Sequence, residues 1–315
     1  ESKDIDFAVL GDSIALARKV ADGLKGAYVG LDETTARVVL PNLQLDFAKI
    51  TESIEKDLQR RDFTINALAL NLSTGKIIDL FSGLDDIKSR TIKVISENSI
   101  TDDPLRLLRA VRLSCVLGFK IEPKTAALIK KHFGLLKDVA SERVNYELFE
   151  ILKIDRCAEY LKLLYDLGLL SLLFPEMKSL PEIGPDGYHH LNLLDHSIET
   201  VRQLEILVEE IPIFPDKIKE YLAQDIAAGH SRLQILKLAC LFHDLGKPET
   251  MKIGEDKTSF IGHEMVGVKL VSKIGTRIRL SGKEIASLKR LVANHMRIGT
   301  LIQGRIITRK AIFRL

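Results

Sequence analysis

The segment DIDFAV at residues 4–9 alternates polar and apolar side chains, and LQLDFA at residues 43–48 repeats the pattern. Alternation with a period of two is typical of a β-strand that buries one face. In the first segment it predicts that Ile5 and Phe7 point into a core. The second segment is expected to bury its leucines and its phenylalanine in the same way. We therefore expect two half-buried strands near the start of the chain.

Three carboxylates occupy the other faces of these strands, Asp4 and Asp6 on the first and Asp46 on the second. If the strands are neighbours, the carboxylates share one surface, where their like charges repel one another unless cations bind. Hard oxygen ligands suit Mg²⁺, and two such ions about 4 Å apart are the usual clamp for an in-line phosphoryl displacement. The alternative is that these residues form an acidic strand face that is merely solvated. The Asp-x-Asp pair taken alone is better explained in that way.

Strands and helices alternate through the rest of the first 80 residues. The predicted elements are a helix at 13–25 with Ser13 as its N-cap, strands at 37–40 and 43–48 around a Pro41-Asn42 turn, a helix at 52–72 and a strand at 76–80. This alternation indicates a small α/β domain.

Two adjacent arginines begin the segment RRDFTINA at residues 60–67, inside the predicted helix at 52–72. A guanidinium can bind phosphate oxygens bidentately, so Arg61 could hold a triphosphate. Asp62 could hold a neighbouring guanidinium or a backbone group. A surface ion-pair cluster explains this segment equally well.

The most informative segment is DDPLRLLRAVR at residues 102–112. It opens a helix predicted at 101–118, with acidic residues in the first turn and a glycine at the end. At 100° per residue, Arg109 lies at the edge of the apolar stripe and Arg112 lies within it. A guanidinium in that position is unfavourable unless it is paired, and an anionic ligand would pair it.

Asp103 and Arg106 lie outside the apolar stripe of this helix. A carboxylate offers acceptors and a guanidinium offers donors, so together they could bond the polar edge of a nucleobase. The alternative is a helix whose arginines form salt bridges with acidic residues of a later helix. The candidate partners are Glu142, Glu147 and Glu150.

The composition excludes several classes of protein. The chain has 315 residues, of which 46% are hydrophobic and 28% are charged, with a formal net charge of +3. It is too apolar for a disordered protein, it lacks an apolar run long enough to span a membrane, and its first residues do not resemble a signal peptide. Cys115, Cys157 and Cys240 are widely spaced among apolar residues, which indicates buried thiols in a reducing compartment. We therefore expect a cytoplasmic protein without a membrane partner.

Beyond about residue 85 the pattern is mostly helical. Helices are predicted at residues 124–132, 141–153, 155–168, 191–210, 233–245, 263–274 and 282–296. The segment from Pro175 to Pro185 is the expected boundary between a middle and a third region.

Taken together, these motifs resemble those of the class II tRNA nucleotidyltransferase and poly(A) polymerase family. Their order and spacing fit over about residues 1–175, and five motifs in series are specific. The matching segments are DID at 4–6 (metal binding), RRDFTINA at 60–67 (ribose and phosphate), DLFSGLDD at 79–86 (flexible linker), DDPLRLLRAVR at 102–112 (nucleotide template), and Glu142-Arg143 with Glu147 (support of the neck).

Another motif, HDLGKP at residues 243–248, ends an apolar helix, and further histidines lie near the ends of other predicted helices. Together they resemble the HD phosphohydrolase domain over about residues 185–300. The resemblance implies a divalent metal that activates water against phosphate esters. The implied ligands are His196, His243, Asp244, His263 and His295. A purely structural role for the His-Asp pair is the alternative.

The two resemblances imply an α+β fold in three parts. These are a palm-like catalytic head at residues 1–85, a helical neck and body that binds nucleotide and tRNA at 86–178, and a helical HD domain at 179–315. They also imply addition of CMP, AMP or both to the tRNA 3′ end from CTP and ATP, without a nucleic-acid template. The primer 3′-hydroxyl attacks the α-phosphate and pyrophosphate leaves, so positioning and charge stabilisation are sufficient for catalysis.

The family match also implies a role for each site residue. Asp4 and Asp6 would hold Mg²⁺, and Asp46 matches the third carboxylate. Asp103 and Arg106 would pair with the incoming base. The arginines implied to contact the nucleotide phosphates or sugar are Arg61, Arg109 and Arg112.

The chain departs from the family pattern in three places. Family members carry a Gly-Gly turn and an Arg-Asp pair before the metal motif, so we expect the head to be N-terminally incomplete. HD domains usually carry a downstream Asp, and none follows Asp256, so we expect that domain to be C-terminally incomplete. Only about 13 residues separate Asp46 from Arg60, where many relatives have a longer loop associated with the switch from CTP to ATP. The short loop indicates either a partial-adding enzyme or missing residues.

Two rival functions stay open at this point. One is a poly(A) polymerase that uses the same head on other RNA 3′ ends. The other is a metal-dependent phosphohydrolase in which the head senses nucleotides.

Overall fold

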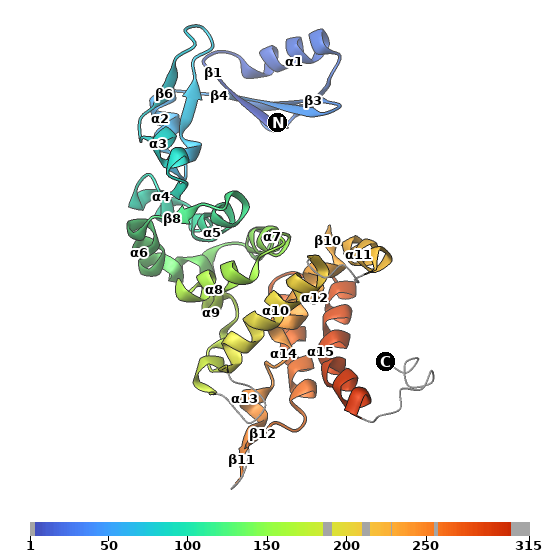
Figure 1. Ribbon diagram of the computed structural model, residues 1–315. Helices are drawn as coiled ribbons and strands as arrows, with labels where there is room; N and C mark the ends of the chain where they lie inside the picture. Colours follow the sequence, from blue (N-terminus) through green and yellow to red (C-terminus); the bar gives the residue numbers. More distant parts are fainter. Residues whose placement is uncertain (1–3, 185–190, 210–214, 228, 255–257, 304–315) are drawn as a thin grey trace. The chain divides into compact units, whose positions relative to one another are not determined.

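The computed structural model describes residues 4–184, 191–209, 215–227, 229–254 and 258–303 (Figure 1). The chain divides into two compact units, residues 1–89 with 93–99 and residues 90–92 with 100–315, and each is described by itself. Unit 1 mixes strands and helices, whereas unit 2 is mostly helical, which confirms the expected α+β class. In the described part of the chain, no helix combines the length and the apolar character needed to cross a membrane.

A four-stranded sheet forms the first half of unit 1 (Figure 1). Its strand order is β1-β4-β3-β2, and the pair β1·β4 is parallel while the other pairs are antiparallel. The helix α1 packs on β3 and β4. The bounds are β1 (Asp4–Val9), α1 (Ser13–Leu24), β2 (Ala27–Gly30), β3 (Thr35–Leu40) and β4 (Leu43–Lys49). The predicted strands and helix are confirmed, and β2 is an element that the sequence pattern did not predict.

The core of this sheet lies under α1. Its buried residues are Ala17, Ala21, Ala36, Val38, Leu45 and Phe47. Phe7 stacks on Phe47 with ring centroids 4.8 Å apart, as the alternation predicted, but Ile5 is 42% exposed. Ile5 is opposite the buried Leu45 and shares the face of Phe7, as predicted, but it is only partly covered. The reason is that β1 is an edge strand of the sheet, and α1 covers β3 and β4 instead of the first residues of β1.

The N-cap of α1 also differs from the prediction. Asp12 is the capping residue, and its side chain accepts a hydrogen bond of 2.9 Å from the backbone N–H of Ala15. Ser13 is the first helical residue instead, and its buried hydroxyl donates to the carbonyl of Thr34 at 2.7 Å. The negative charge of a carboxylate at this position also interacts favourably with the positive end of the helix dipole.

The single helix predicted at 52–72 is wrong. Its place is taken by α2 (Ile54–Gln59), a 3₁₀ turn η1 (Thr64–Asn66) and a short strand β5 (Leu68–Leu70), which pairs antiparallel with β6 (Ile77–Asp79) before α3 (Gly83–Lys88). Asp62 ends the helical run because its buried carboxylate accepts hydrogen bonds from the Phe63 backbone and the Asn66 side chain. Such local side-chain bonds compete with the helical backbone pattern.

The helix predicted at 101–118 is interrupted near its start. The segment forms α4 (Glu97–Asp102) and then α5 (Arg106–Leu117), with Asp103 and Pro104 between them. Proline lacks an N–H and disfavours helical geometry in the residue before it, so the break is a consequence of Pro104. The predicted glycine stop is confirmed, since Gly118 adopts a left-handed conformation with φ of 65°.

The helices predicted after α5 are present in unit 2. The bounds are α6 (Pro123–His132), α7 (Ser141–Leu152), α8 (Ala158–Asp166), α9 (Leu169–Leu173), α10 (Leu193–Glu209), α11 (Asp216–Ala223), α12 (Arg232–Phe242), α13 (Lys247–Thr250), α14 (His263–Arg277) and α15 (Gly282–Gln303). Of these, α9, α11 and α13 are further helices that the sequence pattern did not predict. The expected boundary near Pro175 holds two 3₁₀ turns, η3 (Pro175–Met177) and η4 (Leu180–Glu182). Helices α10, α12, α14 and α15 pack together and bury an apolar core (Figure 1).

Candidate functional site

The three predicted carboxylates of unit 1 lie on neighbouring strands. In the parallel pairing of β1 with β4, Asp6 is directly opposite Asp46, and Asp4 is opposite Gln44. Asp4 and Asp6 are exposed, and the side chain of Asp46 is 25% exposed. The prediction that two strands bring these residues to one face of the sheet therefore agrees with the register. We call Asp4, Asp6 and Asp46 the carboxylate face.

An arginine that the sequence did not single out lies on the carboxylate face. Arg37 of β3 is opposite Asp46 in register, and its Nε and Nη2 atoms each donate to a separate oxygen of Asp46 at 2.7 Å. These hydrogen bonds lower the pKa of Asp46. The pKa of Arg37 is raised by Asp46 first and also by the charges of Asp4 and Asp6. The signal was the alternation in TARVVL at 35–40, which places Arg37 on the polar face.

This donor set fits a hard divalent cation only in part. Asp4 and Asp6 offer carboxylate oxygens, the ligands that Mg²⁺ prefers. Among the described residues, however, the groups of three potential ligand atoms that lie within 4.8 Å of one another belong to unit 2. The carboxylate face does not form such a group while Arg37 binds both oxygens of Asp46. Cation binding by all three carboxylates would therefore require Arg37 to share or release Asp46.

The arginines of the RRDFTINA segment form ion pairs on the surface of unit 1. Arg61 donates to Asp57 at 2.9 Å, and Arg60 contacts Glu52 at 3.4 Å. The surface ion-pair cluster, which the sequence left open as the alternative explanation of this segment, is therefore present. Asp62 holds a backbone N–H, that of Phe63, as expected. Binding of a triphosphate by Arg61 stays a prediction.

The RRDFTINA segment at residues 60–67 contacts the DLFSGLDD segment at residues 79–86 directly. The Thr64 hydroxyl donates to Asp86 at 2.6 Å. A Cβ atom added at Gly83 would lie 2.2 Å from the carbonyl oxygen of Thr64, so only glycine allows this approach. Asp79 accepts backbone hydrogen bonds from Gly83 and Leu84, which outweigh burial and lower its pKa. These contacts hold the two motifs together within unit 1.

Helix α5 has the predicted amphipathic character. Leu107, Leu108 and Val111 are fully buried. Arg112 lies within the apolar side, and its Nε donates to Oε2 of the buried Glu147 in α7 at 2.6 Å. Burial raises the pKa of Glu147 despite the charge of Arg112. Arg112 therefore forms the salt bridge that the sequence offered as the alternative. Contact of Arg112 with a nucleotide stays a prediction.

Asp103 lies in the break between α4 and α5 and is held by α7. Its Oδ2 atom accepts a hydrogen bond of 2.9 Å from Arg143, and its Oδ1 atom accepts one of 3.3 Å from the Leu105 backbone. The sequence indicated that the helix with Arg143 supports the neck but did not predict this contact. Arg106 and Arg109 are half-buried in the same helix as Arg112.

The five predicted HD residues converge in unit 2 from four places in the chain. His196 lies in α10, His243 and Asp244 follow α12, and His263 and His295 lie in α14 and α15. Asp244 is almost fully buried, and each histidine directs its Nε2 atom toward the Asp244 carboxylate at 3.2–3.7 Å. We call these five residues the histidine cluster. The structure therefore brings together the five residues that the sequence predicted for this site.

Backbone carbonyls orient three rings of the histidine cluster. The Nδ1 atoms of His243, His263 and His295 lie 2.8, 2.8 and 2.7 Å from the carbonyl oxygens of Cys240, Phe260 and Val292. A carbonyl only accepts, so Nδ1 carries the proton and Nε2 is left to bind a metal. The donor set of the histidine cluster therefore fits a divalent metal.

Charge is concentrated around Asp244. Burial would raise its pKa, but contacts with His243, His263 and His295 hold that pKa well below its ordinary value. Lys247, which the sequence did not single out, also contacts Oδ2 of Asp244 at 2.8 Å and is only 7% exposed. The carboxylate is therefore ionised and surrounded by groups that can carry positive charge.

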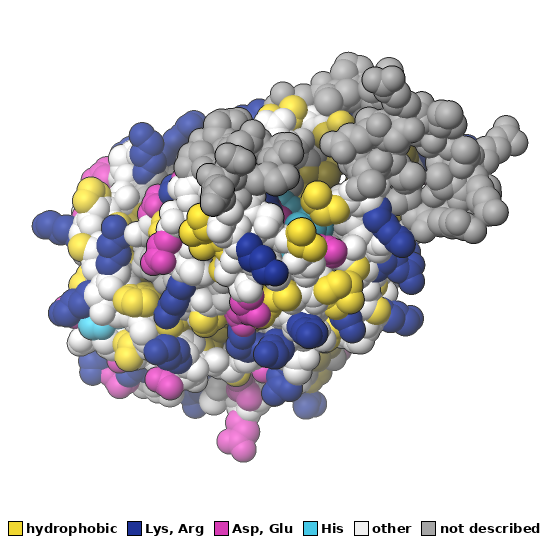
Figure 2. Space-filling model, turned by 90° about the horizontal axis from the view of Figure 1, so that it is seen from below, with side chains coloured by type: hydrophobic (Ala, Val, Ile, Leu, Met, Phe, Trp, Pro, Cys, Tyr) yellow, Lys and Arg dark blue, Asp and Glu magenta, His cyan; other side chains and the backbone are white. Residues whose placement is uncertain are grey.

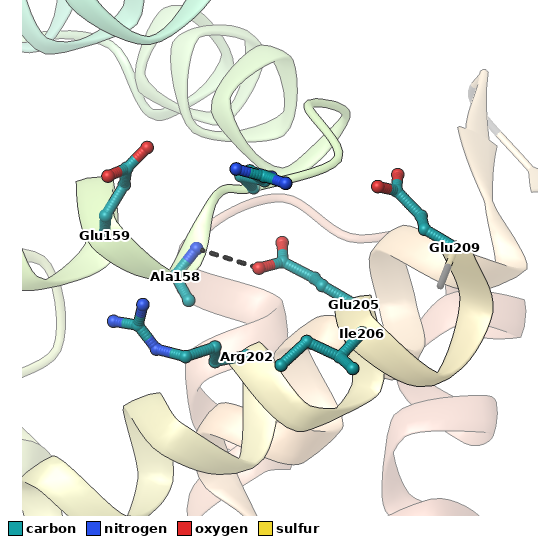
Figure 3. Close-up of a pocket in the computed structure, with 7 residues that line it drawn as sticks. Ala158, Glu159, Arg202, Glu205, Ile206 and Glu209 are labelled. Carbon is teal, nitrogen blue, oxygen red and sulfur yellow. Dashed lines mark hydrogen bonds between the residues drawn. The ribbon is translucent and has the colours of Figure 1, made fainter. Parts of the chain in front are cut away.

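A pocket of about 230 Å³ lies between α8 and α10, away from the predicted site residues (Figure 3). It is lined by Arg156, Ala158, Glu159, Arg202, Glu205, Ile206 and Glu209. The buried Glu205 accepts hydrogen bonds from the Cys157 and Ala158 backbones and pairs with the buried Lys237 at 3.0 Å. These contacts anchor the start of α8, which is a structural role.

Three family models match the chain in series. They are described as "Poly A polymerase head domain" over residues 28–93, "Probable RNA and SrmB- binding site of polymerase A" over 118–180, and "HD domain" over 193–312. The chain belongs to the tRNA nucleotidyltransferase and poly(A) polymerase family.

Named members of this tRNA nucleotidyltransferase family resemble the chain over most of its length. The A-adding tRNA nucleotidyltransferase of Deinococcus radiodurans is 34% identical over 304 residues, which cover 94% of this chain and 65% of that protein. The CC-adding tRNA nucleotidyltransferase of Thermus thermophilus is 30% identical over 302 residues, covering 93% and 64%. The chain therefore spans slightly less than two thirds of these relatives.

Solved structures of tRNA-processing enzymes share the fold. A structure named tRNA-processing enzyme (apo form 2) is 25% identical and covers 96% of this chain and 75% of its own, with a TM-score of 0.69. The Thermotoga maritima CCA-adding enzyme complexed with tRNA is 24% identical and covers 100% and 78%, with a TM-score of 0.59.

Proposed function

We propose that this member of the tRNA nucleotidyltransferase family adds CMP, AMP or both to the 3′ end of tRNA from CTP and ATP, without a nucleic-acid template. The observation that carries the proposal is the register of β1 and β4, which puts Asp6 beside Asp46 with Asp4 two residues away. The printed names of the relatives, A-adding and CC-adding, support the same reaction class. The proposed division is a head at residues 1–85, a neck and body at 86–178 and an HD domain at 179–315.

In this proposal the carboxylate face supplies the metal ligands. Asp4 and Asp6 hold Mg²⁺, with Asp46 as the third carboxylate once Arg37 shares it. When bound, Mg²⁺ stabilises negative charge on the phosphates and lowers the pKa of the attacking hydroxyl. The protein groups position the triphosphate and the RNA end, and the 3′-hydroxyl attacks the α-phosphate as pyrophosphate leaves.

The start of α5 selects and holds the nucleotide. Asp103 offers acceptors and Arg106 offers donors to the polar edge of the base, while Arg143 fixes the orientation of Asp103. The side chains proposed to contact the phosphates or the sugar are Arg61, Arg109 and Arg112. Because Arg112 is buried against Glu147, its contribution depends on that ion pair staying intact.

The test uses three tRNA substrates that end before CCA, after C, or after CC. Each is incubated with CTP alone, ATP alone or both, and the products are sized to one nucleotide. Discrete addition of one to three nucleotides supports the proposal and identifies CC-, A- or CCA-adding specificity. Long adenylate tails would instead support the poly(A) polymerase alternative. A chain carrying Asp4→Asn and Asp6→Asn is the matched control and should extend none of the substrates.

The histidine cluster favours a second candidate function, metal-dependent hydrolysis of phosphate esters. The orientation of three Nδ1 atoms by backbone carbonyls is the observation that favours it, because this leaves Nε2 atoms for a metal. Opening of 2′,3′-cyclic nucleotides to the monophosphate, and release of phosphate from 3′-phosphorylated nucleotides, test it. Loss of these reactions in His243→Ala, with tRNA extension retained, would assign the activity to this cluster.

A further inference from the structure

We propose that Asn145 of α7 is a positioning residue for nucleotide selection, because its buried hydrogen bond to the end of α14 fixes the orientation of α7. Helix α7 in turn holds Asp103 through Arg143. This role rests on the function proposed above for Asp103, and it assigns to the HD domain a part in choosing the nucleotide.

Helix α7 lies between α5 and the HD domain, and its two sides bind different partners (Figure 1). Toward α5, Arg143 binds Asp103 at 2.9 Å and Glu147 binds Arg112 at 2.6 Å. At about 100° per residue, Arg143 and Glu147 lie about 40° apart around the helix axis, whereas Asn145 lies about 160° from each of them. Asn145 is therefore on the side opposite the two residues that hold α5.

The opposite side of α7 is attached to the HD domain at two points. The Nδ2 atom of Asn145 donates to the backbone carbonyl of Ile278 at 2.7 Å, and the two residues are only 8% and 4% exposed. Near the other end of α7, Gln234 of α12 donates to the carbonyl of Phe149 at 2.8 Å. The ring of Phe149 also stacks on His230 with centroids 3.5 Å apart. Both halves of α7 therefore have partners in the HD domain.

The acceptor of the Asn145 bond is a free carbonyl at a helix end. The last four carbonyls of a helix have no partner within it. Helix α14 ends in a Schellman motif, in which backbone N–H groups bond to the carbonyls of Gly275 at 2.8 Å and Thr276 at 3.2 Å. Arg279 takes the left-handed position with φ of 61°, where glycine is usual. The motif gives the turn a defined conformation and leaves the carbonyl of Ile278 for Asn145.

Asn145 is a polar residue among apolar ones. Its buried neighbours on this side of α7 are Leu148, Phe149 and Leu152. An apolar side chain would also be buried here, but hydrophobic contacts have no preferred direction. A hydrogen bond weakens steeply when its angle or length changes, and a rotation of α7 would leave a buried amide and a buried carbonyl unpaired. The amide of Asn145 therefore selects one orientation of α7.

A second link between α7 and the same turn lies on the surface. Glu142 and Arg279 are 3.2 Å apart, but their side chains are 66% and 64% exposed. Exposed ion pairs contribute little to stability, and Figure 2 shows charged side chains spread widely over one face of the molecule. We therefore assign the orientation of α7 to the buried bond of Asn145 and not to this pair.

A small rotation of α7 is enough to disturb Asp103. Rotation by about 20° about the helix axis moves each Cα atom by about 0.8 Å, and the end of a long side chain by more. Such a shift would break the bond of 2.9 Å between Arg143 and Asp103. A displacement of about 1 Å can cost up to about a hundredfold in rate when a reaction depends on the positions of the groups.

The test measures nucleotide preference, the ratio of kcat/KM between favoured and disfavoured nucleotides, on the tRNA substrates described above. Asn145→Leu keeps the size of the side chain but removes its donor. We expect the preference to fall by about fivefold, because displaced groups select less well. Gln234→Glu removes the donor to the Phe149 carbonyl but keeps the acceptor that caps α12, and it should act in the same direction.

Val271→Ala is the control for a general loss of stability, because Val271 is fully buried in α14 and the change removes neither bond to α7. It should lower the midpoint of thermal unfolding, followed by circular dichroism, and leave the preference unchanged. In an Arg143→Ala background, Asn145→Leu should alter the preference by less than about twofold, because both changes act on Asp103.

Unchanged preference in Asn145→Leu and Gln234→Glu would overturn the positioning role, as would effects of Asn145→Leu and Arg143→Ala that multiply. If one of the two variants does not fold, the other decides. Unchanged preference in Asp103→Ala itself would refute the function proposed for Asp103. A changed preference in Asp103→Ala with the parent's preference in Asn145→Leu would refute the positioning role alone.

Discussion

Arg37 and Asp46 face each other across β3 and β4 and are joined by two hydrogen bonds of 2.7 Å. A carboxylate expected to bind a catalytic cation is therefore already paired with a cation of the protein. Since Asp6 lies directly beside Asp46, this pair decides how strongly the carboxylate face attracts metal ions.

Arg37→Ala should strengthen cation binding by the carboxylate face. Removing a unit positive charge about 4 Å from a bound dication removes about 2 kcal/mol of repulsion in a high-dielectric environment, which corresponds to about thirtyfold in affinity. Titration with Mn²⁺ in an Asp244→Asn background measures this binding without the histidine cluster. Arg18→Ala, in α1, is the control for loss of charge elsewhere. Unchanged or weaker Mn²⁺ binding would show that Arg37 does not compete with metal.

The Arg37–Asp46 pair should lose its stabilising effect in acid. The pKa of Asp46 is lowered in the folded chain, so the unfolded chain takes up the proton first as the pH falls. The stabilisation is therefore complete above the ordinary carboxyl pKa of about 3.9 and is lost as the pH falls through the lower folded value. A double-mutant cycle with Arg37→Ala and Asp46→Ala should give about 0.5–1 kcal/mol at pH 7 and less near pH 3. Equal coupling at both pH values would contradict this.

Arg112→Ala should destabilise unit 2 by about 3 kcal/mol at pH 7, because it leaves the buried carboxylate of Glu147 without a partner. Burial already raises the pKa of Glu147, and removal of Arg112 should raise it further. Since the folded chain then keeps this proton more readily, the loss should be smaller at pH 5 than at pH 8. Urea unfolding at both values measures it. Arg112→Met with Glu147→Gln should recover much of the stability, and a loss below 1 kcal/mol in Arg112→Ala would refute the argument.

Asp103→Ala should reduce the preference between nucleotides as well as the rate. It removes the acceptors proposed for the base edge, and loss of a charge-assisted contact costs about 1.5–3 kcal/mol, or about tenfold to a hundredfold in kcat/KM. Arg143→Ala should have a smaller effect in the same direction because it frees the orientation of Asp103. Separate kcat/KM values for CTP, ATP, GTP and UTP measure it. The surface variant Lys153→Ala should match the parent, and an equal loss for all four nucleotides in Asp103→Ala would exclude base recognition.

Gly246→Ala should weaken metal binding by the histidine cluster without removing a ligand. A Cβ atom at this position would lie 2.0 Å from the carbonyl oxygen of His263, so the start of α14 must move. We expect at least a tenfold weaker affinity, since His263 is one of the proposed ligands and metal sites depend on ligand positions within a few tenths of an ångström. Gly282→Ala, where nothing lies within 4 Å, is the matched control. Normal Mn²⁺ affinity in Gly246→Ala would show that the close approach is not needed.

The sequence predicted the parts of the site that follow from local periodicity. Alternation alone placed Asp4, Asp6 and Asp46 on polar strand faces, and the helical pattern placed Arg112 on the apolar side of α5. It failed where a short apolar run suits either structure, since Leu68–Leu70 was assigned to a helix but pairs with β6 as a strand. Long-range pairs had no local signal, because the contact between Asp103 and Arg143 joins residues 40 positions apart.

The histidine cluster was predicted through its resemblance to HD domains, which supplied its members but not their arrangement. The division of four rings between the two oxygens of Asp244 depends on how α10, α12, α14 and α15 pack. Lys247 was overlooked although the signal was local, since it lies three residues after Asp244, a spacing at which side chains in a helical turn meet.

The parallel register of β1 and β4 makes the carboxylate face of unit 1 sensitive to whether an odd or an even number of residues is deleted or inserted within β4. Because successive side chains of a strand point to opposite faces, deleting one residue before Asp46 within β4 would turn Asp46 toward α1 and expose Phe47. Deleting two would restore both. Within β4, an odd change in length would therefore exchange the inner and outer surfaces of the strand beyond the change.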